Sequence, residues 1–479
     1  MPVLQRVALA AVSIIAFLAL CQGASAGVLV ATTPNYVFDG PYIGGPQVAW
    51  QDSRCYIICQ SLPDVEDETA QTVDALRVTR PGRRAIRLFG RLGGGDTGGP
   101  SGGSRSYSFA ISATRLAWLR DARIYDEFEG DSGNSTLRAG RVGGHLPLVY
   151  RCGFGEQGPA QEPNIALDED VLAYQPNPCT ASTARVAVRD LKSGATQEMA
   201  AQPAGEKIRL LRVAGRYLAV SHYGQTAKGL KPPEVTVYDH RTRVVAYEAK
   251  PPPGRSIAGM DVQEDGTLFV ETDAEDGRPG CSKSGLGWYS LDAVFHPLPG
   301  HPCGGPIRAG GGRVVYRTPT SLKQVTSRGI TTTVASFGRV QAAGFDADTH
   351  RSVVAVKRCD QGFDIVSIGI GDAAYRAGSA RCPVALRIPT RLRAVRGAVR
   401  LSVRCPWRCL GRFAVFANHK QLATRLLRIK RGGRVRLRLT RSARSLLSHR
   451  GSVPVAVRAV TLDRDGRRRK TQRLAILSR

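Results

Sequence analysis

The residues best suited to binding chemistry are arginines that alternate with apolar residues near the C-terminus. Two segments show this alternation most clearly, AVRLSVRC (398–405) and RVRLRL (434–439). Successive side chains of a β-strand point to opposite faces, so the arginines of each segment would share one face. A guanidinium group donates several N–H bonds in a fixed fork that matches phosphate or carboxylate oxygens. The pattern predicts a polyanion-binding surface comprising Arg400, Arg404, Arg434, Arg436, Arg438 and, on a third expected strand, Arg458.

The positive charge of the chain is concentrated in its last hundred residues. Residues 381–479 hold 28 Arg and Lys with only Asp463 and Asp465 as acids, whereas the first 380 residues hold 40 basic and 37 acidic side chains. A general preference for arginine would not remove acids from one segment alone, so the asymmetry points to the partner of that segment. The expected partner is an anionic envelope polymer or lipid, with a plain solvated surface as the alternative.

The aromatic residues and the acidic loops of the chain bear on two further partners for this basic segment. Sequence-specific nucleic-acid binding is not expected, because Trp407, Phe413 and Phe416 are its only aromatic residues and would make a poor stacking platform. The first 380 residues are themselves the alternative partner, since their loops DVEDE (64–68) and DEFEGD (126–131) are acidic enough to dock a basic surface. The same loops are also acidic enough to bind calcium.

Common catalytic motifs are missing from the sequence. It contains no G-x-S-x-G elbow, HExxH, P-loop or dinucleotide-binding fingerprint, and its eight histidines do not group. Aspartates at 168–170, 263–266, 272–277 and 346–349 are interpreted as turn residues. A glycosidase or lyase would need two converging carboxylates, which the sequence does not reveal. We therefore predict no catalytic residue, metal or cofactor, and enzyme activity remains open.

The N-terminus predicts export. Arg6 precedes an apolar run (7–20) and an Ala-Ser-Ala site, so residues 1–26 match a secretory signal peptide. The run is shorter than the roughly 20 residues that span a bilayer, and no later segment is apolar enough, so no transmembrane segment is expected. Cys21 lies in a lipobox-like context, but Leu20 occupies the place of the usual small residue, which leaves lipidation open. The mature chain is expected to be secreted, extracellular or associated with the cell envelope.

Ten cysteines remain after Cys21, an even number that predicts disulfides in an exported protein. The sequence does not fix their connectivity. Cys55 and Cys59 would need a turn, because residues four apart in a straight strand are too distant to bridge. Zinc binding is disfavoured, since no histidine lies near a cysteine at the usual spacing. Proximity suggests the pairs Cys152–Cys179, Cys281–Cys303, Cys359–Cys382 and Cys405–Cys409, which leaves Cys55–Cys59.

A short apolar strand recurs seven times in the first 373 residues. Its equivalent positions are Trp50, Trp118, Tyr174, Val220, Val270, Tyr316 and Ala355. Most units span about 40–50 residues and carry several short strands, which is typical of β-propeller blades. The apolar strand GVLVATT (27–33) has no other evident partner and is expected to complete blade seven. Six or eight blades, or an array of sandwiches, are the alternatives. The Gly- and Ser-rich segment RLGGGDTGGPSGGSRS (91–106) is expected to lengthen a loop between blades.

The basic segment predicts a second β domain. Its expected strands are 398–405, 434–439 and 452–462, with a short helix at 440–451 that Thr440 caps and Gly451 ends. The predicted fold class is all-β, a seven-bladed propeller followed by a small immunoglobulin-like β-sandwich. The expected organisation is signal peptide 1–26, β-propeller 27–373, linker 374–381 and basic β-sandwich 382–479.

Both domains resemble known families. VAW, VTVYD and the loop–strand rhythm of residues 27–373 resemble WD40-like and TolB-type repeats of secreted bacterial proteins. CPWRCLG (405–411) resembles a turn in C-terminal sandwich domains of exported actinobacterial proteins. These resemblances imply fold and an extracellular accessory domain, because propellers serve many functions. We expect a non-catalytic binding or scaffold protein whose basic domain anchors it. The alternative is a propeller hydrolase or lyase acting on extracellular polysaccharide or peptide.

Overall fold

The computed structural model describes residues 27–34, 36–55, 72–79, 83–94, 101–126, 132–154, 164–176, 178–179, 184–201, 206–226, 229–274, 283–303, 306–405, 409–429 and 432–479. The expected signal peptide, the lipidation site at Cys21 and the acidic loop 64–68 lie outside these residues, as does all of the second acidic loop except Asp126. No helix in the described part of the chain is long and apolar enough to cross a membrane.

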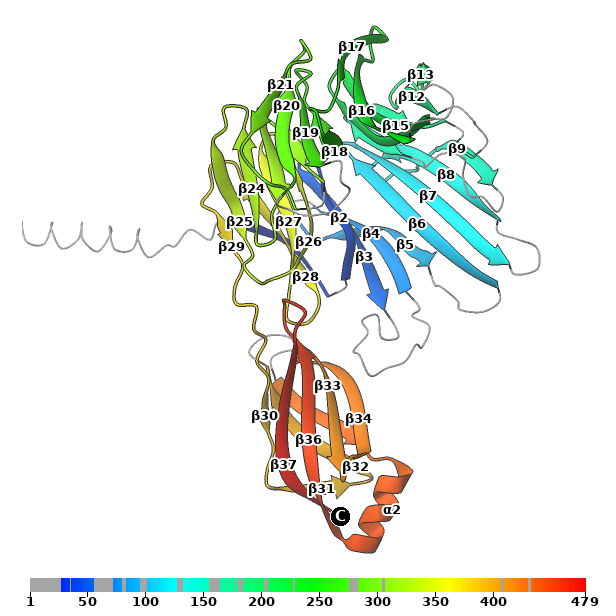
Figure 1. Cartoon of the computed structure of the whole chain (residues 1–479). Helices are drawn as coiled ribbons and strands as arrows, with labels where there is room; N and C mark the ends of the chain where they lie inside the picture. Colours follow the sequence, from blue (N-terminus) through cyan, green and yellow to red (C-terminus); the bar gives the residue numbers. More distant parts are fainter. Residues whose placement is uncertain are drawn as a thin grey trace, which may run out of the picture.

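Seven sheets form a β-propeller above a second β domain (Figure 1). Blades one to three contain β2 (Tyr36–Gly44), β3 (Gln47–Cys55), β4 (Thr72–Thr79) and β5 (Ile86–Gly94); β6 (Ser101–Ile111), β7 (Arg115–Asp126), β8 (Ser132–Arg141) and β9 (Leu148–Phe154); and β10 (Ile165–Asp168), β11 (Val171–Tyr174), β12 (Arg185–Asp190) and β13 (Thr196–Ala201). Blades four to six contain β14 (Glu206–Ala214), β15 (Tyr217–Thr226), β16 (Gly229–Asp239) and β17 (Val244–Ala249); β18 (Arg255–Val262), β19 (Leu268–Ala274), β20 (Gly285–Tyr289) and β21 (Phe295–Leu298); and β22 (Arg308–Gly310), β23 (Arg313–Arg317), β24 (Ser321–Thr326) and β25 (Thr331–Ser336).

The chain closes the propeller ring with strands from both ends of the repeat region. Blade seven contains β26 (Ala342–Ala347), β27 (Arg351–Lys357) and β28 (Phe363–Gly369), and its outer strand is β1 (Val28–Thr33). β1 pairs antiparallel with β28 from Val28 opposite Ser367 to Thr33 opposite Phe363. The seven-blade count and the prediction that the N-terminal strand completes blade seven are both confirmed.

The recurring apolar strand packs the seams between blades. All seven equivalent positions lie on the second strand of their blade, as the repeat pattern indicates. Seven buried apolar clusters each join two neighbouring blades, and the cluster around Trp50 and Phe363 joins blade seven to blade one. A single four-stranded blade would leave its two faces in water, so stacking around the ring stabilises every blade.

One insertion is more regular than its composition suggests. Residues 91–106 were predicted to be an interblade loop because they are rich in Gly and Ser. That prediction is wrong at both ends of the segment, since β5 continues to Gly94 and β6 begins at Ser101. β6 pairs with β7 over its whole length, from Ser101 opposite Asp126 to Ile111 opposite Leu116. Backbone pairing of β5 with β4 and of β6 with β7 therefore outweighs the weak strand propensity of the Gly and Ser residues.

The chain leaves the propeller along blade six. β29 (Tyr375–Arg376) adds to that blade as a fifth strand, parallel to β25. The second domain then contains β30 (Ala385–Arg387), β31 (Arg391–Val395), β32 (Ala398–Arg404), β33 (Cys409–Ala417), β34 (Lys420–Ile429), β35 (Gly432–Arg438), α2 (Arg441–Arg450), β36 (Ser452–Leu462) and β37 (Arg468–Ser478). β31 links two groups of strands, β30–β32–β35 and β37–β36–β33–β34, whose buried side chains form one core.

The expected elements of this second domain are confirmed, with small shifts of their ends. Strands predicted at 398–405, 434–439 and 452–462 correspond to β32, β35 and β36. The side chain of Thr440 accepts from the backbone N–H of Ala443 at 3.2 Å, and Gly451 ends α2 with a positive φ of 69°. The immunoglobulin-like assignment of this domain stays a prediction.

Two of the expected disulfides are present, Cys152–Cys179 and Cys359–Cys382. The second joins the β27–β28 turn of blade seven to the start of the basic domain. Cys303 and Cys405 are also disulfide-bonded. Cys59, Cys281 and the side chains of Cys55 and Cys409 lie outside what the structure describes, so their pairings stay predictions.

Candidate polyanion-binding surface

Five of the six predicted arginines lie on one exposed sheet face, which we call the arginine face. It comprises Arg400, Arg404, Arg434, Arg436 and Arg438 of β32 and β35, which pair antiparallel. Arg400 is directly opposite Arg436, and Arg434 is opposite Ser402. The intervening Val399, Leu401 and Val403 are buried in the domain core. The alternation read from the sequence therefore separates core from charge as expected.

Arg387 belongs to the same face and was missed by the sequence analysis. It is exposed on β30 opposite Ser402, so Ser402 lies between Arg387 and Arg434 in one cross-strand row. Side chains in such a row have Cβ atoms about 5 Å apart. β30 has only three residues, too short for its alternation to stand out, although the apolar Leu386 next to Arg387 was a weak signal in the sequence.

Arg458 does not join this face. It lies on β36, in the other group of strands, where its guanidinium stacks 4.9 Å from the centre of the Phe416 ring. Its Nε also donates to Gln472 Oε1 at 2.8 Å. Period-two alternation assigns a residue to one face of its own strand but does not say which sheet that strand joins.

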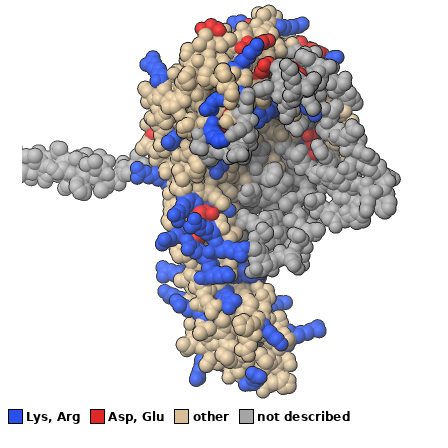
Figure 2. Space-filling view, viewed as in Figure 1, with Lys and Arg blue, Asp and Glu red and all other residues tan. Residues whose placement is uncertain are grey.

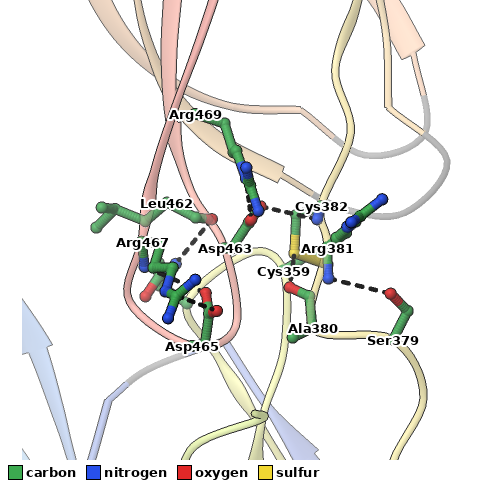
Figure 3. Close-up of polar contacts among 11 residues, drawn as sticks. Cys359, Ser379, Ala380, Arg381, Cys382, Leu462, Asp463, Asp465, Arg467 and Arg469 are labelled. Carbon is green, nitrogen blue, oxygen red and sulfur yellow. Dashed lines mark hydrogen bonds and ion pairs between the residues drawn. A yellow bond between two sulfur atoms is a disulfide. The ribbon is translucent and has the colours of Figure 1, made fainter.

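Within the described residues, the arginines of this face form no ion pair with an acid. Like charges directly opposite each other in a sheet are destabilising, so the Arg400–Arg436 pair is unfavourable for folding. Both acids of the basic domain lie far along the chain, in the β36–β37 turn, where Asp463 accepts from Arg469 Nε at 2.6 Å and Asp465 pairs with Arg467 at 3.5 Å (Figure 3). In Figure 2 the end of the domain remote from the propeller shows Lys and Arg but no Asp or Glu.

The β36–β37 turn fixes the basic domain against the propeller. Asp463 also accepts from the backbone N–H of Cys382 at 2.9 Å, beside the Cys359–Cys382 disulfide (Figure 3). The backbone N–H of Gln341 donates to the Arg464 carbonyl at 3.1 Å, and Gln361 Nε2 donates to the Leu462 carbonyl at 3.4 Å. These contacts hold the arginine face in one orientation relative to blade seven.

The propeller contains one arrangement that resembles a catalytic relay. His222 Nδ1 lies 2.8 Å from Glu206 Oε2, and His222 Nε2 lies 3.2 Å from Thr236 Oγ1. A nucleophilic hydroxyl must reach its substrate, but Thr236 is only 7% exposed on β16. The arrangement satisfies a buried histidine within blade four. Among the described residues, no group of three or more His, Cys, Asp or Glu could hold a metal.

Charged side chains on the first strands of blades four to seven compensate one another. Arg212 Nε lies 3.6 Å from Asp261 Oδ1, and Arg308 Nε donates to Asp346 Oδ1 at 2.6 Å. Aspartates of three first strands also accept a backbone N–H from the next blade: Asp168 from Gly215, Asp261 from Ala309 and Asp346 from Ile43, each at 2.7 Å. The turn role predicted for Asp168 and Asp346 is therefore wrong, because both carboxylates latch one blade to its neighbour.

Glu271 is a buried carboxylate on β19. Burial, and next the charge of Asp273, raise its pKa to about 7, while Arg209 acts in the opposite direction. The unfolded chain ionises this group near 4.5, so the native state binds the extra proton between pH 4.5 and 7. The contribution of Glu271 to the free energy of unfolding is therefore fully present below pH 4.5. It is lost as the pH rises from 4.5 to about 7.

We expect Glu271→Gln to remove this loss, which is on the order of 3 kcal/mol across the window. The measurement is the urea midpoint of wild type and variant at several pH values. Glu248→Gln, at an exposed position of β17, should keep the wild-type profile. Identical profiles for wild type and Glu271→Gln would contradict the assignment.

Solved structures that are similar to this chain share little of its sequence. No family model and no curated protein sequence matches it. It is similar to the β-propeller domain of the Trilobed protease from Pyrococcus furiosus, with 9% identity, a TM-score of 0.44, and coverage of 70% of this chain and 95% of the other. An acylaminoacyl peptidase from Pyrococcus horikoshii gives 10% identity and a TM-score of 0.41, with 75% of this chain and 58% of that chain covered. An oligogalacturonate lyase in complex with manganese gives 12% identity and a TM-score of 0.39, with 71% and 98% covered.

Proposed function

We propose that this chain is a secreted, non-catalytic binding or scaffold protein of the cell envelope, anchored by its basic domain to an anionic polymer or lipid. The observation that carries the proposal is the arginine face, where exposed guanidinium groups share one surface and no acid of the basic domain lies in the strands that form it. The resemblance of residues 27–373 to secreted TolB-type repeats and the ten cysteines of the mature chain support an extracellular location.

The spacing of the face suits a repeating anion. Arginines two residues apart on one strand are about 7 Å apart, and neighbouring strands are about 4.8 Å apart. A polymer or lipid surface with a phosphate at each repeat can occupy several such positions at once. Each arginine near an anionic surface contributes about 1 kcal/mol, so binding should depend steeply on salt.

The test is co-sedimentation of the full chain with washed bacterial envelopes from about 50 mM to 500 mM salt. Replacing Arg400, Arg404, Arg434 and Arg436 by Ala should weaken binding at low salt by up to roughly a thousandfold and flatten its salt dependence. The matched control replaces four other arginines by Ala and removes the same charge from β36, β37 and the C-terminal residue: Arg458, Arg468, Arg473 and Arg479. Equal losses in both variants would reject the arginine face as the anchor.

The alternative, a hydrolase or lyase acting on extracellular polysaccharide or peptide, is best supported by Glu271 and Asp273. These two carboxylates share one face of β19, and the charge of Asp273 helps to hold the pKa of Glu271 high, as acid–base pairs require. Glu271 is only 5% exposed, so a substrate would have little access to its carboxylate. The geometry therefore favours binding over catalysis.

A further inference from the structure

A cavity of about 400 Å³ lies where the propeller meets the basic domain. Its walls come from the end of blade six (336–339), the connecting segment (376–381) and the β36–β37 hairpin. This volume lies within the range of about 300–1,000 Å³ that is usual for small-molecule sites. The lining includes four arginines and one acid: Arg339, Arg376, Arg381, Arg469 and Asp465.

Three of these arginines are free to bind a ligand. Arg469 is already committed to Asp463, and Asp465 pairs with Arg467. Arg339, Arg376 and Arg381 are exposed, and in the part of the chain that the structure describes none has an acid within ion-pair distance. Arg339 lies in the loop after β25, Arg376 lies on β29, and Arg381 immediately precedes Cys382. The fold therefore brings three uncompensated guanidinium groups to one small cavity.

We propose that this cavity binds a dianionic phosphate group carried by a sugar-sized molecule. Guanidinium forks donate paired N–H bonds to phosphate oxygens, and arginines from several directions suit a tetrahedral group with several oxygens. The volume leaves room for more than the phosphate alone. The proposal goes beyond the envelope anchor, because none of these residues lies on the arginine face.

The site also couples ligand to domain arrangement. Its walls belong to both domains and to the segment between them, so a bound phosphate would contact all three. A ligand that binds only the assembled joint stabilises that arrangement by mass action. We expect saturating phosphate to slow tryptic cleavage within residues 374–381.

The experiment is calorimetric titration of inorganic phosphate into the full chain at constant ionic strength, at a pH where phosphate is a dianion. We expect one site per chain, weakened at least tenfold in the double variant Arg376→Ala/Arg381→Ala. Arg381→Lys keeps the charge but loses the fork, and should show a smaller loss. Arg328→Ala, an exposed arginine at the opposite end of β25, is the matched control and should bind like wild type.

Two further arms identify the source of the phosphate and keep this site distinct from the anchor. Displacement by glycerol 3-phosphate assigns a small phosphate ester, and displacement only by long-chain polyphosphate assigns the end of a polymer. The double variant Arg434→Ala/Arg436→Ala should bind inorganic phosphate like wild type. The double variant Arg376→Ala/Arg381→Ala should still co-sediment with envelopes like wild type. The proposal would be overturned if the wild type showed no saturable phosphate binding, or if the double variant Arg376→Ala/Arg381→Ala still bound phosphate like wild type. It would also be overturned if Arg328→Ala lost binding or if neither competitor displaced phosphate. An unchanged urea midpoint shows that a variant is folded.

Discussion

Replacing Asp346 by Ala should cost about 4 kcal/mol of unfolding free energy. Its carboxylate joins three blades, because Oδ1 accepts from Arg308 Nε of blade six at 2.6 Å and Oδ2 accepts from the Ile43 backbone N–H of blade one at 2.7 Å. The variant would leave the mostly buried Arg308 guanidinium without its carboxylate partner and the Ile43 N–H without its acceptor, next to the seam that closes the ring. The measurement is the chemical denaturation midpoint of the full chain.

Two comparisons make this result specific to the latch. Asp346→Asn retains an oxygen for the Ile43 N–H but loses the charge that pairs with Arg308, so we expect an intermediate loss. Asp265→Ala removes an exposed turn aspartate that accepts from Thr267 at 2.9 Å, and should cost about 1 kcal/mol or less. If Asp346→Ala were no more costly than Asp265→Ala, the cross-blade carboxylate would not stabilise ring closure.

Replacing Asp463 by Ala should release the basic domain from its fixed position against the propeller. Asp463 is 1% exposed and accepts from both Cys382 N–H and Arg469 Nε, so its loss leaves a buried donor unpaired beside an unpaired charge. We expect the joint to weaken by about 2–3 kcal/mol, which raises its open population roughly 30- to 150-fold. Asp465→Ala, in the same turn, removes only a surface pair and should cost less than about 1 kcal/mol.

Limited trypsin digestion reads out this opening. Arg376 and Arg381 lie between the two cysteines of the Cys359–Cys382 disulfide. Cleavage there should leave the fragments joined on a non-reducing gel and separate them on a reducing gel. Asp463→Ala should be cleaved much faster than wild type, and Asp465→Ala nearly as slowly as wild type. Equal cleavage rates for all three proteins would show that Asp463 does not hold the joint.

Local pattern was enough to predict one strand of every blade, the strand that closes the ring, three strands of the basic domain and part of the site. The recurring strand around Trp50 and its equivalents identified all seven blades, because each blade repeats the same burial on its second strand. Alternation in AVRLSVRC and RVRLRL identified the arginines that face solvent, since period two is a property of the strand itself. The glycine-rich segment 91–106 was misread because strand pairing, not side-chain propensity, extends β5 and β6.

The sequence by itself determined the period of the repeat and the distribution of charge, because these depend on residues close in the chain, whereas it only suggested the Cys152–Cys179 pair that the structure contains. Only the tertiary structure decided that Arg387 joins the arginine face, that Arg458 does not, and that Asp346 latches blade seven to blade one. It alone brought Arg339, Arg376 and Arg381 to one cavity. Such juxtapositions depend on which strands become neighbours, and that choice is made by the packing of the whole core rather than by any local pattern.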